Sequence, residues 1–346
     1  MAPWTLDILP LAGGAPTVTG ASFMSARITW ALDGIGAAEV ELSPSDVASG
    51  AWLYGRRRIR FKDGGGTARY AGWLDRLERS GKPSDIRYRA SSRGLAAIMD
   101  QRVVHGDFPK VSVVATTIAW NLIQHMVAQT FDQTGFTLGT ITGTAPSRSR
   151  WYCDGDVIKD SIDELANLSN GFAWEIDPAG AFNAWVGGRG TDVSGSVTLA
   201  PTTTIDWQAT GDASEFASYV TAIGDVDEET PCGAPVAIDF NTHRTAYGRR
   251  EVVVTHPTRD AGELLEAGTE GLRAQAASGM NLRTAWVEGQ GPWSFGTRWL
   301  GDIVDVTLGA EFGGSADMRC IGITVNLEPT TSAGTPFIEM EWEMVP

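Results

Sequence analysis

Alternating apolar and polar residues predict antiparallel strands near the front of the chain. Ile59 and Phe61 alternate with arginine and lysine, which is the period of a strand with one buried and one wet face. A glycine turn over Asp63–Gly66 follows, then an apolar strand over Ala68–Leu77 and a third strand over Ser84–Ala90. A phosphate-binding loop would need a helix start or a GK[ST] ending after the glycines, and this stretch has neither. The glycines therefore join two strands of a hairpin.

The same order of strands and turns recurs near the end of the chain. Strands are predicted over Val304–Leu308, Gly322–Leu327 and Ile338–Glu343, with a glycine turn between the first two. A glycine stands inside the middle strand of each set, Gly72 in the first and Gly322 in the second. Strand glycines often mark a β-bulge, so both sets are expected to bend alike. We predict two tube-type antiparallel β-barrel domains related by internal duplication. Chance similarity between two glycine-rich hairpin regions is the alternative.

The middle of the chain has a helical period instead. Residues 112–130 carry apolar side chains on one helical face, and Asp156 is placed to cap a second helix that ends before Gly171. A hairpin is predicted over residues 172–186. The fold class is therefore mainly β with an α+β insertion. The predicted domains are a first barrel at 1–104, the insertion at 105–200, and a second barrel at 201–346 with a helix near 260–278.

Composition and charge exclude several classes of protein. The 346 residues carry a formal net charge of −15, which argues against tight binding to nucleic acid. No apolar run approaches the length of a membrane span, and the first residues lack the features of a signal peptide, so we expect assembly in a cytoplasm. The three cysteines, Cys153, Cys232 and Cys320, are too widely spaced for a disulfide framework or a zinc site.

Candidate chemistry is sparse. The four histidines lack metal-ligand spacing, the acidic run at residues 225–229 lacks the spacing of a calcium loop, and no GxSxG motif occurs. We therefore expect no enzyme activity, no metal and no cofactor. Paired carboxylates of a glycosidase meet in space and leave no motif, so a glycan-binding or glycan-cleaving β protein stays an alternative. Most of the thirteen tryptophans fall in strand patterns that are typical of a core.

Four stretches resemble one known family. "ELSPSDVASGAWLYGRRRIRFKDGGGTARYAGWLDRLE" is similar to the first barrel of the tail hub or baseplate hub proteins of tailed bacteriophages, which include the late control protein D group and minor tail proteins of siphophages. "YCDGDVIKDSIDELANLSNGFAWEIDPAGAFNAW" is similar to their insertion. "SEFASYVTAIGD" and "WLGDIVDVTL" resemble strands of their second barrel. The resemblance covers nearly the whole chain, and it is one of pattern, without a catalytic motif.

The resemblance implies a structural virion protein at the tail tip. In such proteins two barrels per chain, arranged as a homotrimer, form a pseudo-sixfold ring around the DNA exit channel. The implied partners are the distal tail protein ring, the tape measure protein, and tip or receptor-binding proteins, while DNA passes through without specific binding. The chain ends just after its last predicted strand, so we expect no lytic extension. A hexameric distal tail or tail tube protein is a further alternative.

Two charged strand faces are the candidate lumen or subunit-interface residues. An acidic channel wall lets a polyanion slide, whereas a basic wall would hold it. The acidic set shares one face of a strand and consists of Glu339, Glu341 and Glu343. The basic set belongs to the first barrel and consists of Arg58, Arg60, Arg87 and Arg89. Opposite signs on the two barrels would favour unlike neighbours in a ring. An ordinary wet strand face is the alternative for both sets.

Overall fold

The computed structural model describes residues 4–32, 34–47, 52, 55, 57–82, 85–129, 134–168, 170–201, 206–211, 217–224, 235–239, 251–256, 260–277, 280–308, 314–327 and 336–345. The chain is mainly β with antiparallel sheets, as the sequence predicts. The acidic run at 225–229, Cys232 and His243 lie outside the described residues.

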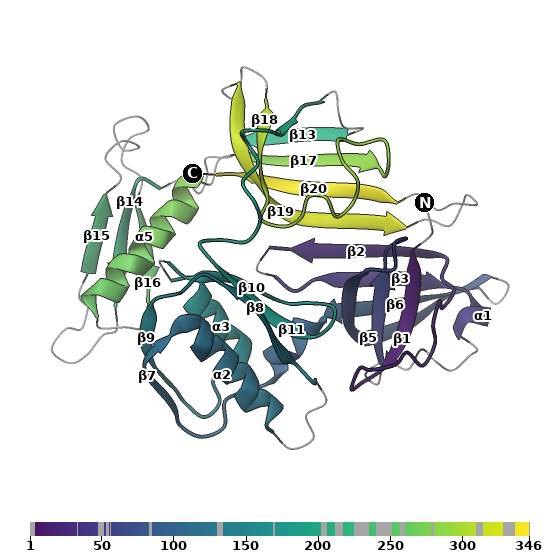
Figure 1. The fold of residues 1–346 in the computed structure, drawn as a ribbon, viewed down its shortest axis with the longest axis horizontal. Helices are drawn as coiled ribbons and strands as arrows, with labels where there is room; N and C mark the ends of the chain where they lie inside the picture. Colours follow the sequence, from purple (N-terminus) through teal and green to yellow (C-terminus); the bar gives the residue numbers. More distant parts are fainter. Residues whose placement is uncertain are drawn as a thin grey trace.

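One continuous sheet organises the molecule (Figure 1). In spatial order its strands are β1 (Thr5–Pro10), β4 (Arg57–Lys62), β5 (Ala68–Lys82), β6 (Asp85–Gly94), β3 (Ala37–Leu42), β2 (Ser25–Ala31), β19 (Ser315–Leu327), β20 (Phe337–Met344), β17 (Met280–Val287) and β13 (Asp206–Gly211). Beside this path, β18 (Ile303–Thr307) pairs with the first part of β19, and β12 (Thr198–Leu199) pairs with β18. A short helix, α1 (Pro44–Val47), follows β3.

The two halves of this sheet have the same strand order. The first half reads β1-β4-β5-β6-β3-β2 and the second reads β12-β18-β19-β20-β17-β13. If the six strands of each half are numbered along the chain, both orders are 1-4-5-6-3-2. Corresponding pairs are antiparallel in both halves except at the outer strand, where β1 is antiparallel to β4 and β12 is parallel to β18. An origin of the two halves by duplication stays a prediction.

Both halves also have a β-bulge at the same place, and of the two predicted glycines Gly322 borders it while Gly72 does not. The pairing of β5 with β6 shifts between Leu74 and Arg76, and the pairing of β19 with β20 shifts between Cys320 and Gly322. Gly322 therefore corresponds to Arg76, and its predicted match with Gly72 is wrong. Gly72 is needed for a different reason, because an added Cβ would lie 2.4 Å from the carbonyl oxygen of Arg93.

Strands β2 and β19 form the seam between the halves. Six antiparallel residue pairs join them, from Gly322 opposite Ala31 to Leu327 opposite Ala26. One hydrophobic core underlies the whole sheet and takes fully buried side chains from both halves, among them Phe61, Leu74, Trp286 and Trp342. The seam and the shared core hold the two halves in one unit.

The insertion has a second core of its own. It contains η1 (Leu95–Gln101), β7 (Phe108–Val114), α2 (Ala115–Val127), β8 (Thr137–Thr142), β9 (Ser147–Tyr152), α3 (Ile158–Ala166), β10 (Phe172–Ile176) and β11 (Ala181–Val186). Both predicted helices and the predicted hairpin are present. The predicted cap is wrong: Val157 precedes the first turn of α3, and the Asp156 carboxylate accepts the Cys153 N–H at 2.7 Å instead.

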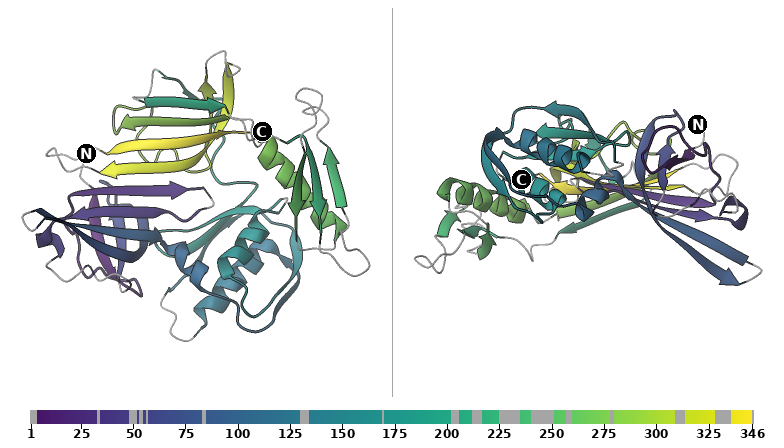
Figure 2. Two further views of the ribbon diagram at one scale, coloured as in Figure 1. Left: turned by 180° about the vertical axis from the view of Figure 1, so that it is seen from behind. Right: turned by 90° about the horizontal axis from the view of Figure 1, so that it is seen from below.

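A third, smaller unit lies to one side of the molecule (Figure 2). It pairs β14 (Tyr219–Ile223) with β15 (Pro235–Asp239) and β16 (Glu251–Thr255), and α5 (Ala261–Ala277) packs on this sheet. The Asp260 carboxylate caps α5 by accepting the Glu263 N–H at 2.9 Å. An ion pair of 2.7 Å between Glu263 and Arg150 of β9 ties α5 to the insertion.

Candidate functional site: a polar face across both halves

The face of the sheet opposite the shared core is polar. Successive side chains of a strand point to opposite faces, so each strand can bury one set and expose the other. In β20, Ile338, Met340 and Trp342 are fully buried while Glu341 between them is exposed. The same alternation holds in β3 and β2 of the first half and in β13 of the second.

This polar face carries basic and acidic side chains in nearly equal number. From β5 to β13 its members are Arg76, Glu78, Ser80, Lys82, Arg87, Arg89, Ser91, Arg93, Glu39, Glu41, Ser25, Arg27, Thr29, Arg319, Thr324, Asn326, Glu339, Glu341, Glu343, Asn281, Arg283, Asp206, Gln208 and Thr210. Within each half basic and acidic strands alternate, because basic β6 lies beside acidic β3, and acidic β20 lies between arginines of β17 and β19.

The three glutamates of β20 are balanced by these neighbouring strands. Glu339 pairs with Arg283 of β17 and accepts a hydrogen bond from Asn326 at 2.9 Å. Glu343 lies 3.9 Å from the guanidinium of Arg319, and Glu341 stands opposite Arg283 in the register. The hydrogen bond and the charge of Glu339 raise the pKa of Arg283 above its ordinary value. The acidic set is therefore one row of a mixed face rather than an acidic wall.

Two of the four predicted arginines belong to this face. Arg87 and Arg89 are exposed on β6, and Arg89 stands between Glu41 of β3 and Glu78 of β5 in the register. The Arg89 guanidinium lies 3.8 Å from the Glu41 carboxylate. The sequence prediction thus placed these two arginines and the three glutamates of β20 on strands that share one face.

Arg58 and Arg60 lie on the same side of the sheet by register, since Arg58 is opposite Trp73 and Trp73 is opposite Arg93, but on β4 this side is covered, so neither belongs to the exposed polar face. Arg58 is 6% exposed; its guanidinium stacks 4.1 Å from the centre of the Trp73 ring and donates to the Thr134 carbonyl at 3.0 Å. Arg60 donates to the carboxylate of buried Asp7 at 2.8 Å. Arg58 thus contacts β5 and the insertion, and Arg60 contacts β1, so both arginines make contacts within the chain.

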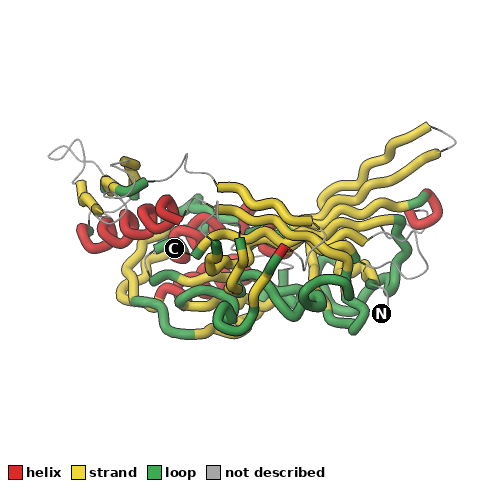
Figure 3. Tube along the Cα trace, turned by 90° about the horizontal axis from the view of Figure 1, so that it is seen from above, coloured by secondary structure: helices red, strands yellow, loops and turns green. Residues whose placement is uncertain are grey.

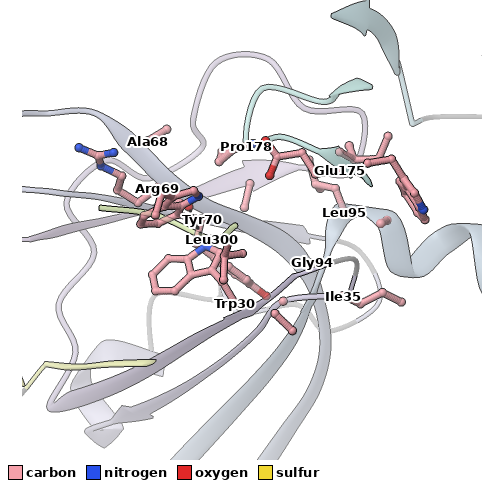
Figure 4. Close-up of a pocket in the computed structure, with 18 of the residues that line it drawn as sticks. Trp30, Ile35, Ala68, Arg69, Tyr70, Gly94, Leu95, Glu175, Pro178 and Leu300 are labelled. Carbon is pink, nitrogen blue, oxygen red and sulfur yellow. Dashed lines mark hydrogen bonds between the residues drawn. The ribbon is translucent and has the colours of Figure 1, made fainter. Parts of the chain in front are cut away.

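A hollow of about 190 Å³ lies where the first half, the insertion and the loop before β18 meet. Figure 4 shows Glu175 and Pro178 on one side of it and Trp30 on the other. Glu175 pairs with Arg189 at 2.7 Å, and burial raises the pKa of the Glu175 carboxyl because Arg189 offsets it only in part. Glu175 is the one carboxylate among the described residues that line the hollow, so this place lacks the pair that glycoside hydrolysis needs.

Within the described part of the chain, no three histidine, cysteine, aspartate or glutamate side chains gather as metal ligands would. None of the described helices is long and apolar enough to cross a lipid bilayer. Cys153 is exposed, while Cys320 is buried, which raises the pKa of its thiol. The polar face is the main candidate site.

Comparison with known proteins gives matches of structure only, since no family model and no curated protein sequence matches the chain. A tail protein from Neisseria meningitidis MC58 superposes with a TM-score of 0.70 at 15% identity, over 99% of this chain and 96% of that one. The 43 kDa tail protein of prophage MuSo2 from Shewanella oneidensis gives 0.68 at 16% identity, over 98% and 97%. The chain has the fold of phage tail proteins.

A third tail protein agrees with the first two. Prophage tail protein gp18 from Listeria monocytogenes EGD-e gives a TM-score of 0.62 at 10% identity, over 97% of this chain and 94% of that one. The phage tail fold therefore extends over the whole chain, including the insertion and the small unit with α5. The resemblance to phage tail hub proteins predicted from the sequence is confirmed at the level of the fold.

Proposed function

We propose that the chain is a structural tail hub protein of a tailed bacteriophage, which forms a homotrimeric, pseudo-sixfold ring around the DNA exit channel. The observation that carries this proposal is the shared strand order of the two halves, joined at the β2–β19 seam into one sheet with a continuous polar face. Two similar halves in each of three copies would present six similar units to the sixfold tail tube above.

The charge pattern of the polar face supports its place along the channel. DNA is held by rows of lysine and arginine that neutralise several phosphates at once. On this face the exposed arginines alternate with carboxylates, as Arg89 does with Glu41 and Arg283 with Glu339. On a mixed surface of this kind, in a chain of net charge −15, carboxylates of neighbouring strands offset each row of arginines, so the genome passes without specific binding.

In this role the protein has neighbours above and below. The ring joins the distal tail protein and the end of the tape measure protein to the tip or receptor-binding proteins, and it is assembled in the host cytoplasm and located at the virion tail tip. It works without catalysis or a cofactor.

Symmetry is the decisive measurement. The purified chain, and tails extracted from particles, would be examined by mass photometry and by electron microscopy with image averaging. Trimers, or a ring of three chains with six similar units at the tail tip, are the expected result. Hexamers of the whole chain would instead indicate a distal tail or tail tube protein. A chain that is absent from the particle would overturn the proposal.

A further inference from the structure

Among the strand edges of the continuous sheet to which no described strand is paired, two matter here. One is the outer edge of β13, the last strand of the path. The other is the second part of β5: β4 pairs with Ala68–Trp73 only, and residues 76–82 have a described partner, β6, on one side alone. Figure 3 shows the β5–β6 hairpin projecting beyond the rest of the sheet. Edges of this kind leave backbone N–H and C=O groups free to pair with another chain.

The seam inside the chain shows how two such edges fit together. By the shared strand order, β2 of the first half corresponds to β13 of the second, and β19 corresponds to β5. The seam joins β2 to the part of β19 that follows the bulge, from Gly322 to Leu327. The corresponding part of β5 also follows the bulge and is the free stretch from Arg76 to Lys82. A chain thus carries one filled seam and the two separate edges of a second.

We propose that β13 of one copy pairs antiparallel with residues 76–82 of β5 in the next copy, so that the seam inside each chain is repeated between chains and the ring closes. The partner is therefore a second copy of this chain. The inference rests on the proposed ring, since it needs several copies, but it names the edges and the register through which they join.

The two bulges fix the register. Arg76 takes the place of Gly322, so Glu78 and Ser80 take the places of Thr324 and Asn326. In the second half, pairing through β17 places Gln208 where Arg27 stands in the first. This follows because Arg27 is opposite Glu39, Gln208 is opposite Arg283, and Glu39 and Arg283 occupy the same register position. Asn326 is opposite Arg27 in the seam, so Ser80 is expected opposite Gln208 of the next copy.

The side chains suit this register. Two residues on from Ser80, Lys82 would stand opposite Asp206, and both are exposed. Two residues before it, Glu78 would stand opposite Thr210. Each of these contacts joins residues of the polar face, whereas a slip by one residue would turn partly buried Trp207 toward that face. The repeated seam therefore extends the polar face from one copy to the next.

A pair of cysteines tests the register. The variant Ser80→Cys, Gln208→Cys, made with Cys153→Ser and Cys232→Ser, places one thiol on each edge. Directly opposite residues lie about 4.5–5.5 Å apart and can form a disulfide, while a diagonal pair at about 7–8 Å cannot do so without backbone movement. Mild oxidation of assembled trimers or tails should give covalent dimers and trimers on a non-reducing gel, ending at the trimer. The matched control is the variant Ser80→Cys, Thr210→Cys in the same background. It should give at least tenfold less cross-linked dimer and trimer.

The outcomes separate the seam from the ring. Trimers by mass photometry that do not cross-link, or that cross-link equally in the control, would overturn the proposed seam and leave the ring standing. A chain that forms no trimer alone or in tails would overturn both. Circular dichroism of each variant confirms folding, which both substitutions should preserve because Ser80 and Gln208 are exposed.

A charge exchange between Lys82 and Asp206 tests the same seam in a second way. Lys82→Asp or Asp206→Lys alone should weaken the trimer by about two- to fivefold, the scale of one exposed ion pair. The double variant should restore it, because the pair re-forms with its signs exchanged. Single losses without recovery in the double variant would contradict the pairing of Lys82 with Asp206.

Discussion

The indole N–H of Trp342 donates to the hydroxyl of Thr284 at 3.0 Å, and both side chains are fully buried beneath β17 and β20. Thr284→Val keeps the shape of the side chain but leaves this N–H without its acceptor. We expect a loss of about 1–3 kcal/mol in the free energy of unfolding, measured by urea denaturation. Thr67→Val, at an exposed turn position, is the control and should change stability by less than about 0.5 kcal/mol. Equal losses in the two variants would contradict the assigned role of the bond.

Asp7 provides a pH-dependent part of the stability. Burial alone would raise the pKa of its carboxyl, but hydrogen bonds from Lys62 and Arg60 lower the pKa below its ordinary value. The ionised form therefore stabilises the fold above about pH 3.9, the pKa of an unfolded aspartate, and this contribution is lost as the pH falls through the lower folded value. Asp7→Asn should destabilise the chain by about 1–3 kcal/mol at pH 7.

The difference in the free energy of unfolding between the wild type and Asp7→Asn should be constant from about pH 7 to pH 5. It should shrink below about pH 4, because only the wild type has a carboxylate at position 7 that gains a proton. Urea denaturation over this pH range measures it. A difference that grows on acidification would show that the carboxylate is not held in its charged form by Arg60 and Lys62.

Gly190 allows the chain leaving the insertion to touch the start of β18. It has a φ of +93°, and an added Cβ would lie 2.1 Å from the carbonyl carbon of Gly301. Gly188 has a φ of +104° with nothing within 4 Å of such a Cβ. Both changes to alanine carry the backbone strain of about 1–2 kcal/mol, but Gly190→Ala adds a steric overlap of about 1–3 kcal/mol. In thermal unfolding, Gly190→Ala should have a clearly lower Tm than Gly188→Ala. The reverse order would contradict the close approach of Gly190 to Gly301.

Replacing Glu339, Glu341 and Glu343 by lysine would turn a mixed face into a basic one. The lysines would stand beside Arg283 and Arg319, so we expect new affinity for double-stranded DNA that falls roughly tenfold or more between about 50 and 200 mM salt. Fluorescence anisotropy with a labelled duplex measures binding, and plaque counts measure the expected impairment of ring assembly or DNA release.

The control for this charge reversal places three lysines away from the polar face, at exposed Asp107, Asp160 and Glu251. The change in net charge is the same in both triple variants. Any difference between them in DNA binding or infectivity therefore depends on where the lysines lie. If both bind DNA alike, or if the reversed face leaves infectivity unchanged, the polar face does not line the channel.

The sequence predicted most strands of the first and last thirds, because alternation such as that of Ile59 and Phe61 reports burial on one face directly. It did not predict the seam, since Thr29 and Thr324 are opposite each other across nearly the whole length of the chain and alternation does not specify a partner. The burial of Arg58 was missed for a related reason: its contacts with Trp73 and with the Thr134 carbonyl of the insertion are not visible in local alternation.

The candidate face was only partly predictable. Its acidic row was found in the local period of β20, but the arginines that balance this row, Arg283 and Arg319, come from other strands and reach it through sheet pairing. Gly72 was misleading because a glycine inside a strand can serve close backbone approach as well as a bulge. Register, rather than residue type, identified the equivalent positions.

The seam between β2 and β19 also has a consequence for how the chain is made. The ribosome releases β2 long before β19. While the insertion and the small unit are being synthesised, the backbone groups along one side of β2 therefore have no strand to pair with. Contacts of such long sequence separation form slowly. Biogenesis of this protein therefore includes a vulnerable interval, during which premature association between incomplete chains competes with correct closure.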